Sequence, residues 1–187
     1  MRFPLPRRAH ALLLLVLVGG VSGLRAEEPG TAPLGLSAWR RGATPPLALG
    51  DLSGAEVKIG AFRGRTVVLN FWATWCESCR TEMPSLQRLA EHFADAPVTV
   101  LTVDVGESRD RVRSFLGETG TKLPVLFDSD GAAASRWQVV GLPTSFVLGP
   151  DGQIRYYFVG ELDWMRKDVL RTVASLQPPR APARAAK

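Results

Sequence analysis

Two cysteines three positions apart are the side chains of this sequence best suited to covalent chemistry. Cys76 and Cys79 are the only cysteines in the 187-residue chain, and they follow the largely apolar run Thr66–Trp72. This pattern predicts a buried strand and then a helix that begins near Cys76. Free backbone N–H groups and the helix dipole stabilise a thiolate at such a position, and the thiolate is the nucleophile of disulfide exchange. We therefore expect Cys76 to attack a disulfide and Cys79, one turn further into the helix, to resolve the mixed disulfide.

Two other interpretations of the pair are a static structural disulfide and half of a metal site. A structural bridge gains most when it closes a long loop, and this loop is very short. A zinc site needs four ligands, but the sequence has no second cysteine pair and its only histidines are His10 and His92. We therefore expect no metal and no cofactor. A non-catalytic module that holds Cu(I) with the two thiolates stays open as an alternative.

The segments around the pair alternate between strand-like and helix-like patterns. The predicted strands are Leu47–Leu52 and Glu56–Ile59, which form a hairpin, then Thr66–Trp72, Val98–Val103, Val125–Phe127, Thr144–Leu148 and Ile154–Val159. The predicted helices are Cys76–Phe93, Asp110–Thr119, Ala132–Trp137 and Asp163–Leu176, with Asp163 as the N-cap of the last. This order predicts an α/β domain of three layers.

The two ends of the chain differ from this central part. Residues 1–26 contain four arginines, no acid and an apolar core, which is typical of a secretion signal. Cleavage is favoured over an uncleaved N-terminal anchor, because the apolar stretch of about 14 residues is shorter than a spanning helix. Residues 27–46 are expected to be a linker, and 177–187 a disordered tail. The folded domain is then 47–176, in the periplasm or exoplasm, where disulfides persist.

The positive charge of the chain belongs to its ends. The whole chain has 23 basic and 18 acidic residues, and removing the four arginines of residues 1–26 leaves 19 against 18, a net charge of +1. Without the three basic residues of the tail the balance is 16 against 18, a net charge of −2. A nucleic-acid partner requires clustered positive charge on the folded domain, so this class is excluded. Nothing in the sequence suggests more than a monomer.

The chain resembles the thioredoxin superfamily, and within it the exported TlpA/ResA-like branch that includes cytochrome c maturation thioredoxins. The matching motifs are Val68–Pro84 and Gly141–Gly152, and the likeness extends over residues 46–176. The resemblance implies a thioredoxin-like three-layer α/β/α sandwich, with an N-terminal β-hairpin and a central insertion around residues 110–128. It also implies the activity of a protein disulfide oxidoreductase.

The resemblance assigns roles to single residues. Cys76 matches the attacking cysteine and Cys79 the buried one. Pro143 matches the cis-proline that lies against the pair, and its implied purpose is to offer the backbone of Leu142 to an extended substrate. Trp75 matches the aromatic residue before the pair and is expected to shield it. Trp75, Leu142 and Pro143 are therefore the expected substrate-binding residues.

Two residues, Asn70 and Glu82, bear on proton transfer at the cysteine pair. Asn70 stands where many thioredoxins carry an aspartate six residues before the first active cysteine, and a neutral amide cannot take up a proton. Glu82 matches the acidic residue that the ResA-like branch carries close to the pair. A partly buried carboxylate there has a raised pKa and can relay protons to Cys79, which would make Glu82 catalytic. A solvated surface glutamate is the alternative.

The resemblance and the export signal together predict a reductase that takes electrons from a membrane thiol carrier and passes them to a disulfide-bearing client protein. Apocytochrome c, or a copper-site protein with paired cysteines, is the implied client. A dithiol oxidase or isomerase would use the same pair, and only the reduction potential separates these activities. The acidic Glu77 between the cysteines slightly favours a reductant. A peroxidase needs a differently activated cysteine, and no matching motif is present.

Overall fold

The computed structural model describes residues 35–178, so the predicted signal and most of the predicted tail lie outside the described residues. The strands are β1 (Ser37–Ala38), β2 (Ala48–Asp51), β3 (Glu56–Lys58), β4 (Thr66–Trp72), β5 (Val98–Val105), β6 (Val125–Asp128), β7 (Thr144–Leu148) and β8 (Ile154–Val159). The helices are α1 (Glu77–His92), α2 (Arg109–Thr119), α3 (Ala132–Arg136) and α4 (Lys167–Ser175), with a 3-10 turn, η1, at Ile59–Phe62.

All eight strands form one mixed sheet in the order β1-β8-β7-β4-β5-β6-β2-β3. The central strand β4 pairs in parallel with β5 and antiparallel with β7, and β5 pairs in parallel with β6. All seven residues of β4 are buried, which explains its nearly continuous apolar sequence. Because β4, β5 and β6 are parallel, the loops after them meet at one edge of the sheet, where sites of α/β proteins commonly lie.

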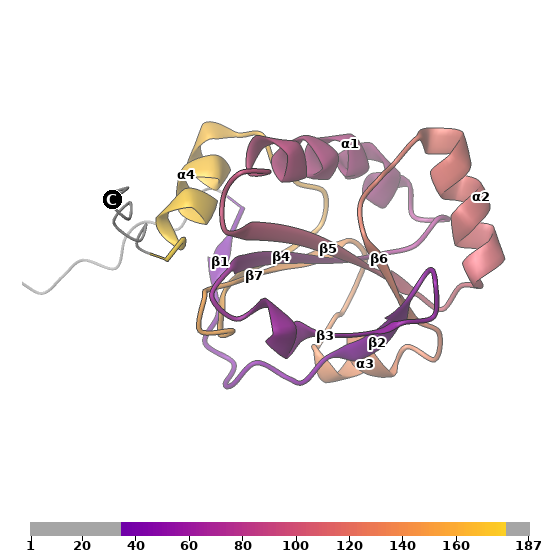
Figure 1. Ribbon diagram of the computed structural model, residues 1–187, viewed down its shortest axis with the longest axis horizontal. Helices are drawn as coiled ribbons and strands as arrows, with labels where there is room; N and C mark the ends of the chain where they lie inside the picture. The colour runs from indigo at the N-terminus through magenta and orange to yellow at the C-terminus, as the bar shows by residue number, and fades with distance from the viewer. Residues whose placement is uncertain (1–34, 179–187) are drawn as a thin grey trace, which may run out of the picture. The chain divides into compact units, whose positions relative to one another are not determined.

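Helices cover both faces of the sheet, as Figure 1 shows. α1, α2 and α4 pack on one face through a core that includes Trp72, Leu86 and Trp164. α3 lies on the other face, where Phe71 and Trp137 belong to a second core. Successive residues of β4 therefore point into different cores, as the alternation of a strand requires. The three-layer α/β architecture predicted from the sequence is confirmed.

Most predicted elements have the expected bounds. β4, β7 and β8 start and end where the sequence predicts, and the first hairpin is present as β2 and β3. α1 is one residue shorter than predicted at each end, α2 and α3 differ by one residue at one end, and β5 and β6 are slightly longer. Among residues 35–178, no helix combines the length and the apolar character needed to cross a bilayer.

The prediction that the last helix begins with Asp163 as its N-cap is wrong. α4 begins at Lys167, with Arg166 at the N-cap position. Asp163 instead closes a turn, in which its carboxylate accepts the backbone N–H of Met165 at 3.0 Å. The fully buried Trp164 belongs to this turn and packs into the core from it, which explains why an apparently helical apolar pattern starts before the helix.

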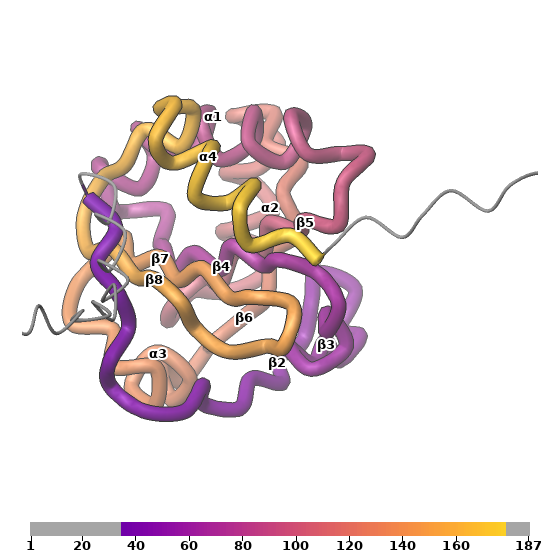
Figure 2. Tube along the Cα trace, turned by 90° about the vertical axis from the view of Figure 1, so that its left-hand side faces the viewer, coloured from indigo at the N-terminus to yellow at the C-terminus, as the bar shows by residue number. Residues whose placement is uncertain are grey.

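The part of the predicted linker that the structure describes, residues 35–46, contributes a strand to the sheet. Ser37 and Ala38 form β1, which pairs antiparallel with Tyr156 and Tyr157 of β8. Trp39 lies beside the Tyr157 ring, with a centroid distance of 5.7 Å. Figures 1 and 2 place β1 at the same end of the sheet as α4. The Gly/Ala/Pro composition of this segment concealed the large apolar side chains that hold it in place.

Candidate active site

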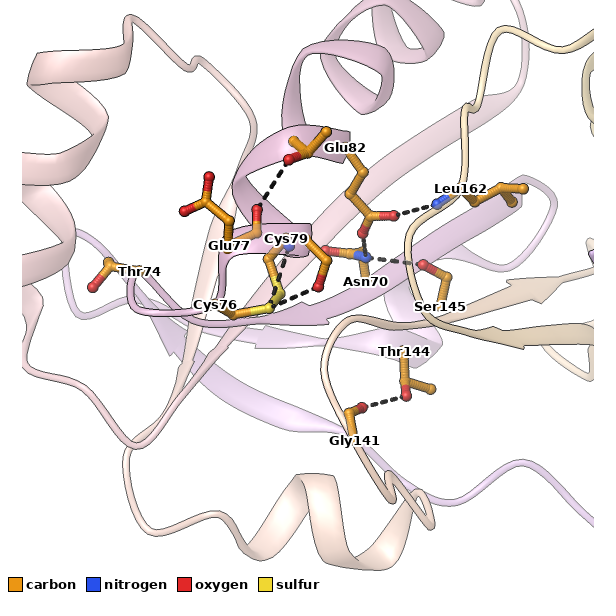
Figure 3. Close-up of a disulfide and its surroundings, with 12 residues drawn as sticks. Asn70, Thr74, Cys76, Glu77, Cys79, Glu82, Gly141, Thr144, Ser145 and Leu162 are labelled. Atoms are coloured by element: carbon orange, nitrogen blue, oxygen red, sulfur yellow. Dashed lines mark hydrogen bonds between the residues drawn. A yellow bond between two sulfur atoms is a disulfide. The ribbon is translucent and has the colours of Figure 1, made fainter.

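The cysteine pair lies at the N-terminus of α1, just beyond the carboxyl end of β4 (Figure 3). Cys76 and Cys79 form a disulfide, with their Cα atoms 5.2 Å apart. Cys76 is the N-cap of α1, and its sulfur accepts the backbone N–H of Cys79 at 3.2 Å. This sulfur therefore lies at the positive end of the helix dipole, where a thiolate is stabilised after reduction.

The two cysteines differ in their access to solvent. Cys76 is 6% exposed, whereas Cys79 is completely buried beneath it. The hydroxyl of Ser78 lies 3.6 Å from the Cys76 sulfur, and Trp75, which precedes Cys76, is 66% exposed. An incoming sulfur can therefore approach only Cys76, while Trp75 presents an apolar surface beside it.

The Leu142–Pro143 peptide bond is cis, as the family resemblance implied. The loop that contains this bond leads into β7, whose first residue, Thr144, pairs with Phe71 near the carboxyl end of β4. The Thr144 hydroxyl donates to the carbonyl oxygen of Gly141 at 2.6 Å, which closes the loop next to the cysteine pair (Figure 3). A substrate-binding role of Leu142 and Pro143 stays a prediction.

Three large apolar side chains are exposed in the described part of the chain, and they belong to the segments that meet at the carboxyl end of β4. They are Trp75, Val140, which is 81% exposed, and Val159, which is 43% exposed. Val140 precedes Gly141 in sequence, and Val159 pairs with Thr144 across the sheet. The two valines have no signal in the sequence, because their exposure depends on the sheet and not on a local pattern. They add exposed apolar side chains at the end of the sheet that carries Cys76.

Glu82 is buried, with 2% of its surface exposed, which excludes the alternative of a solvated glutamate. Its carboxylate accepts the side-chain N–H of Asn70 at 2.6 Å and the backbone N–H of Leu162 at 3.1 Å (Figure 3). Burial raises the pKa of Glu82 to about 7, although these two donors oppose the shift. A carboxyl group with this pKa can accept or donate a proton near neutral pH.

Asn70 has a role that the sequence analysis missed. Its amide group, fully buried in β4, donates to both Glu82 and the Ser145 hydroxyl on β7. The amide cannot replace an aspartate as a base, but it fixes the orientation of the glutamate that lies near the pair. The signal available in the sequence was a polar residue inside an apolar strand, since a buried polar group needs a partner.

The sequence analysis also missed an acidic pair at the carboxyl end of β5. Asp104 is 1% exposed, and Glu107 contacts Thr74 in the loop before Cys76. The available signal was an acid at each side of the end of a buried strand, because the loops after parallel strands meet at one edge.

Comparison with known proteins agrees with this fold and site. A secreted thiol-disulfide isomerase from Corynebacterium glutamicum has a structure that matches with a TM-score of 0.67, at 26% identity, over 79% of this chain and 93% of its own. The architecture and the helix-terminal disulfide define a thioredoxin-like thiol–disulfide oxidoreductase.

Within this class, the chain belongs to the AhpC/TSA family, whose model matches residues 42–157. It is similar to the thiol-disulfide oxidoreductase ResA of Bacillus subtilis, with 36% identity over 59% of this chain and 62% of the relative. ResA of Geobacillus kaustophilus is 33% identical over 72% of this chain and 76% of its own length. The resemblance to ResA-like proteins inferred from the sequence is confirmed.

Proposed function

We propose that this oxidoreductase is exported and reduces disulfides in client proteins through the Cys76–Cys79 couple. The observation that carries the proposal is the arrangement of the pair, with one cysteine slightly exposed, its partner fully buried, and Glu82 buried nearby on the same helix. This order of burial matches the two successive attacks of disulfide exchange. The exposed acidic Glu77 beside Cys76 disfavours the thiolate and supports the reducing direction.

In the reduced protein, the Cys76 thiolate attacks one sulfur of the client disulfide, and the other client sulfur leaves as a thiolate. Cys79 then gives its proton to the Glu82 carboxylate and attacks the Cys76 sulfur. The second client sulfur leaves and takes up a proton, so the client gains two electrons and the protein keeps the disulfide. In this mechanism Cys76, Cys79 and Glu82 are the catalytic residues.

The client would lie across Trp75 and the backbone of Leu142, next to Pro143, as an added extended segment. Apocytochrome c, or a copper-site protein with paired cysteines, is the client class that the ResA-like resemblance supports. A membrane thiol carrier would return the electrons, because cytoplasmic reductants do not reach an exported domain directly. The protein would act as a monomer without a cofactor.

Export is supported by the arginines and the apolar core of residues 1–26. In this proposal the domain 47–176, extended at its start by β1, works in the periplasm or exoplasm, either free after signal cleavage or tethered by an N-terminal anchor. N-terminal sequencing of protein recovered from outside the cytoplasm distinguishes the two. A protein that stays in the cytoplasm with residues 1–26 intact would contradict export.

The direction of electron flow is tested by the midpoint potential of the Cys76–Cys79 couple at pH 7 in a defined redox buffer. We expect a value near or below the roughly −270 mV of thioredoxin. A value near the roughly −120 mV of strong oxidants would reverse the direction and favour the oxidase. Tight stoichiometric Cu(I) binding without any turnover would favour the non-catalytic module instead.

Clients are identified by trapping with Cys79→Ala, which leaves Cys76 free to attack but removes the resolving sulfur. We expect the variant to accumulate mixed disulfides with exported proteins that contain paired cysteines. Cys76→Ala is the matched control, because Cys79 is buried and cannot be reached. Equal trapping by both variants would contradict the assigned order of attack.

A further inference from the structure

The loop between β4 and Cys76 is held by a carboxylate from a neighbouring segment. Glu107, in the connection between β5 and α2, accepts the backbone N–H of Thr74 at 2.5 Å and its hydroxyl at 2.6 Å. Arg111 of α2 donates to Glu107 at 2.7 Å and to the Thr74 hydroxyl at 2.9 Å. Thr74 lies two residues before Cys76 (Figure 3), so these contacts determine where the loop presents Trp75 and the attacking sulfur.

These contacts are sheltered from water. The side chain of Glu107 is 6% exposed and Thr74 is 5% exposed, while the Arg111 side chain is 61% exposed. Hydrogen bonds to an ionised carboxylate are stronger than neutral ones, and shelter from solvent strengthens them further. The position of the loop therefore depends on Glu107 staying ionised and staying in place.

Asp104 lies near the end of β5, three residues before Glu107. It pairs with Trp72 on one side and Phe127 on the other, and 1% of its surface is exposed. Neither of its carboxyl oxygens has a partner in good hydrogen-bond geometry among residues 35–178. The polar groups that act on it are the carboxyl and the backbone N–H of Glu107, followed by the charge of Arg111. Two neighbouring buried carboxyl groups resist losing both protons, so near neutral pH one proton is kept between them.

The surrounding charges place this proton on Asp104. Burial, and then the adjacent Glu107, raise the pKa of Asp104 to about 8. Glu107 is also partly buried, but its hydrogen bonds with Thr74, Asp104 and Arg111 hold its pKa below the usual value.

The other ionisable groups nearby belong to the two helices above. Arg80 of α1 and Glu118 of α2 line a cavity of about 380 Å³ together with Thr74 and Arg111. Asp128, at the corresponding end of β6, is engaged elsewhere, because its carboxylate accepts backbone N–H groups at the start of α3. Arg111 is therefore the cation that acts directly on the acidic pair.

We propose that Asp104 and Glu107 share one proton. This proton keeps the Glu107 carboxylate hydrogen-bonded to Thr74. Both acids are therefore positioning residues for the loop that carries Trp75 and Cys76. With the proton on Asp104, its hydroxyl donates to Glu107, whose charge stays with Thr74 and Arg111. Loss of the proton leaves two buried negative charges side by side. Repulsion from Asp104 then pushes Glu107 and its Arg111 partner away from Thr74, and the loop is released. The inference holds for either direction of electron transfer and goes beyond the proposed function.

The first test follows the backbone amide resonance of Thr74 with pH in the oxidised full-length protein by NMR. In the natural protein we expect this resonance to shift with a midpoint near 8, the pH at which Asp104 ionises. In Asp104→Asn the side-chain amide donates to Glu107 at every pH, so the shift should disappear. A natural protein without the shift, or the same shift in Asp104→Asn, would overturn the proposal.

Asp110→Asn is the matched control for this experiment. The Asp110 side chain is 92% exposed and pairs with Arg113, so the substitution removes one nearby negative charge without contact to Thr74. We expect it to keep the transition of the natural protein. Loss of the transition in this variant would mean that Thr74 responds to general surface charge, which contradicts the proposal.

The second test measures how fast reduced protein reacts with a small aromatic disulfide, a probe that needs no client surface. Glu107→Gln should slow the reaction about tenfold at pH 7, because the loop loses its ionised acceptor and the attacking sulfur is misplaced. Asp104→Asn should keep the natural rate at pH 7 and lack the natural protein's additional pH dependence near 8. If both variants react with the disulfide as fast as the natural protein at every pH, the positioning role is wrong, whatever the midpoint potential of the Cys76–Cys79 couple.

Discussion

At the residue scale, Glu82 is an acid that the fold holds close to half ionisation at neutral pH. Its carboxylate has two donors, Asn70 and Leu162, but no cation is in contact with it among the interactions of residues 35–178. Burial therefore prevails over hydrogen bonding, and the pKa reaches about 7. A base with this pKa suits the deprotonation of a buried thiol such as Cys79 near neutral pH.

Glu82→Gln should slow the resolution of mixed disulfides about a hundredfold at pH 7, which is the usual loss when a general base is removed. The pH dependence centred near 7 should also disappear, since glutamine does not titrate. Stopped-flow reduction of insulin between pH 5 and 9 measures both effects. Glu91→Gln, an exposed acid at the other end of α1, is the control. An unchanged pH profile in Glu82→Gln would remove Glu82 from the mechanism.

Stability should fall as pH rises through the range in which Glu82 ionises. Its pKa in the folded protein is raised from 4.5 to about 7, so the folded state binds more protons than the unfolded state between these values. The shift corresponds to roughly 3 kcal/mol, present below pH 4.5 and lost by about pH 7. The raised pKa of Asp104 also lowers stability as pH rises, over a range that extends to about pH 8.

Urea unfolding at pH 4.5 and pH 7.5 tests this expectation. The natural protein should lose more unfolding free energy between the two pH values than Glu82→Gln does. The difference between the two proteins isolates the contribution of Glu82 from that of Asp104 and of the surface carboxylates. Identical losses would mean that the carboxyl group of Glu82 is not buried in solution.

At the element scale, the strand β1 shows how a short segment gains order from packing. Two residues of pairing with β8 do not hold a strand by themselves, but the flanking side chains add apolar contacts. Leu36 is 2% exposed, and Trp39 contacts Phe146 and Tyr157 edge-on. The strand also covers β8, which would otherwise be an open sheet edge.

Trp39→Ala should therefore lower the free energy of unfolding by about 2 kcal/mol, since a half-buried indole and two aromatic contacts are lost. The pairing of β1 with β8 should weaken at the same time, which faster amide exchange at Tyr157 would reveal. Ser37→Ala, an exposed position of the same strand, is the control and should be neutral. Equal stability of Trp39→Ala and the natural protein would show that β1 is dispensable for the fold.

At the scale of the whole molecule, the site is assembled from segments that are distant in sequence. The exposed Trp75, Val140 and Val159 come from the loop before α1, the loop before β7 and the end of β8. The sheet order brings these segments to one place, because β4, β7 and β8 are neighbours. An apolar surface around a reactive sulfur favours contact with a polypeptide over contact with a small polar thiol.

Val140→Ser should raise the KM for insulin about fivefold, because the client loses apolar contact area beside Cys76. The rate with a small aromatic disulfide should stay unchanged, since this probe reaches the sulfur without the surrounding surface. Steady-state kinetics with both substrates make the comparison. Equal effects on both substrates would place Val140 in the chemistry of the pair and not in client contact.

The sequence by itself determined the reactive pair, its position at a helix start and most of the elements. These features are local, since the apolar run of β4 and the spacing of the cysteines act within a few residues of the chain. Local patterns failed at β1 and at the start of α4. In both places an aromatic side chain, Trp39 or Trp164, is held by packing against distant segments.

Only the tertiary structure decided which acids act on the pair. Glu82 meets Asn70 and Leu162, which lie on β4 and beyond β8, while Glu107 reaches Thr74 from the next parallel strand. Such contacts depend on the order of the strands and on which side of each strand faces α1. Neither can be predicted from a local sequence pattern. The proton chemistry of the site is therefore a product of the fold, because burial and neighbouring charges set the pKa of each acid.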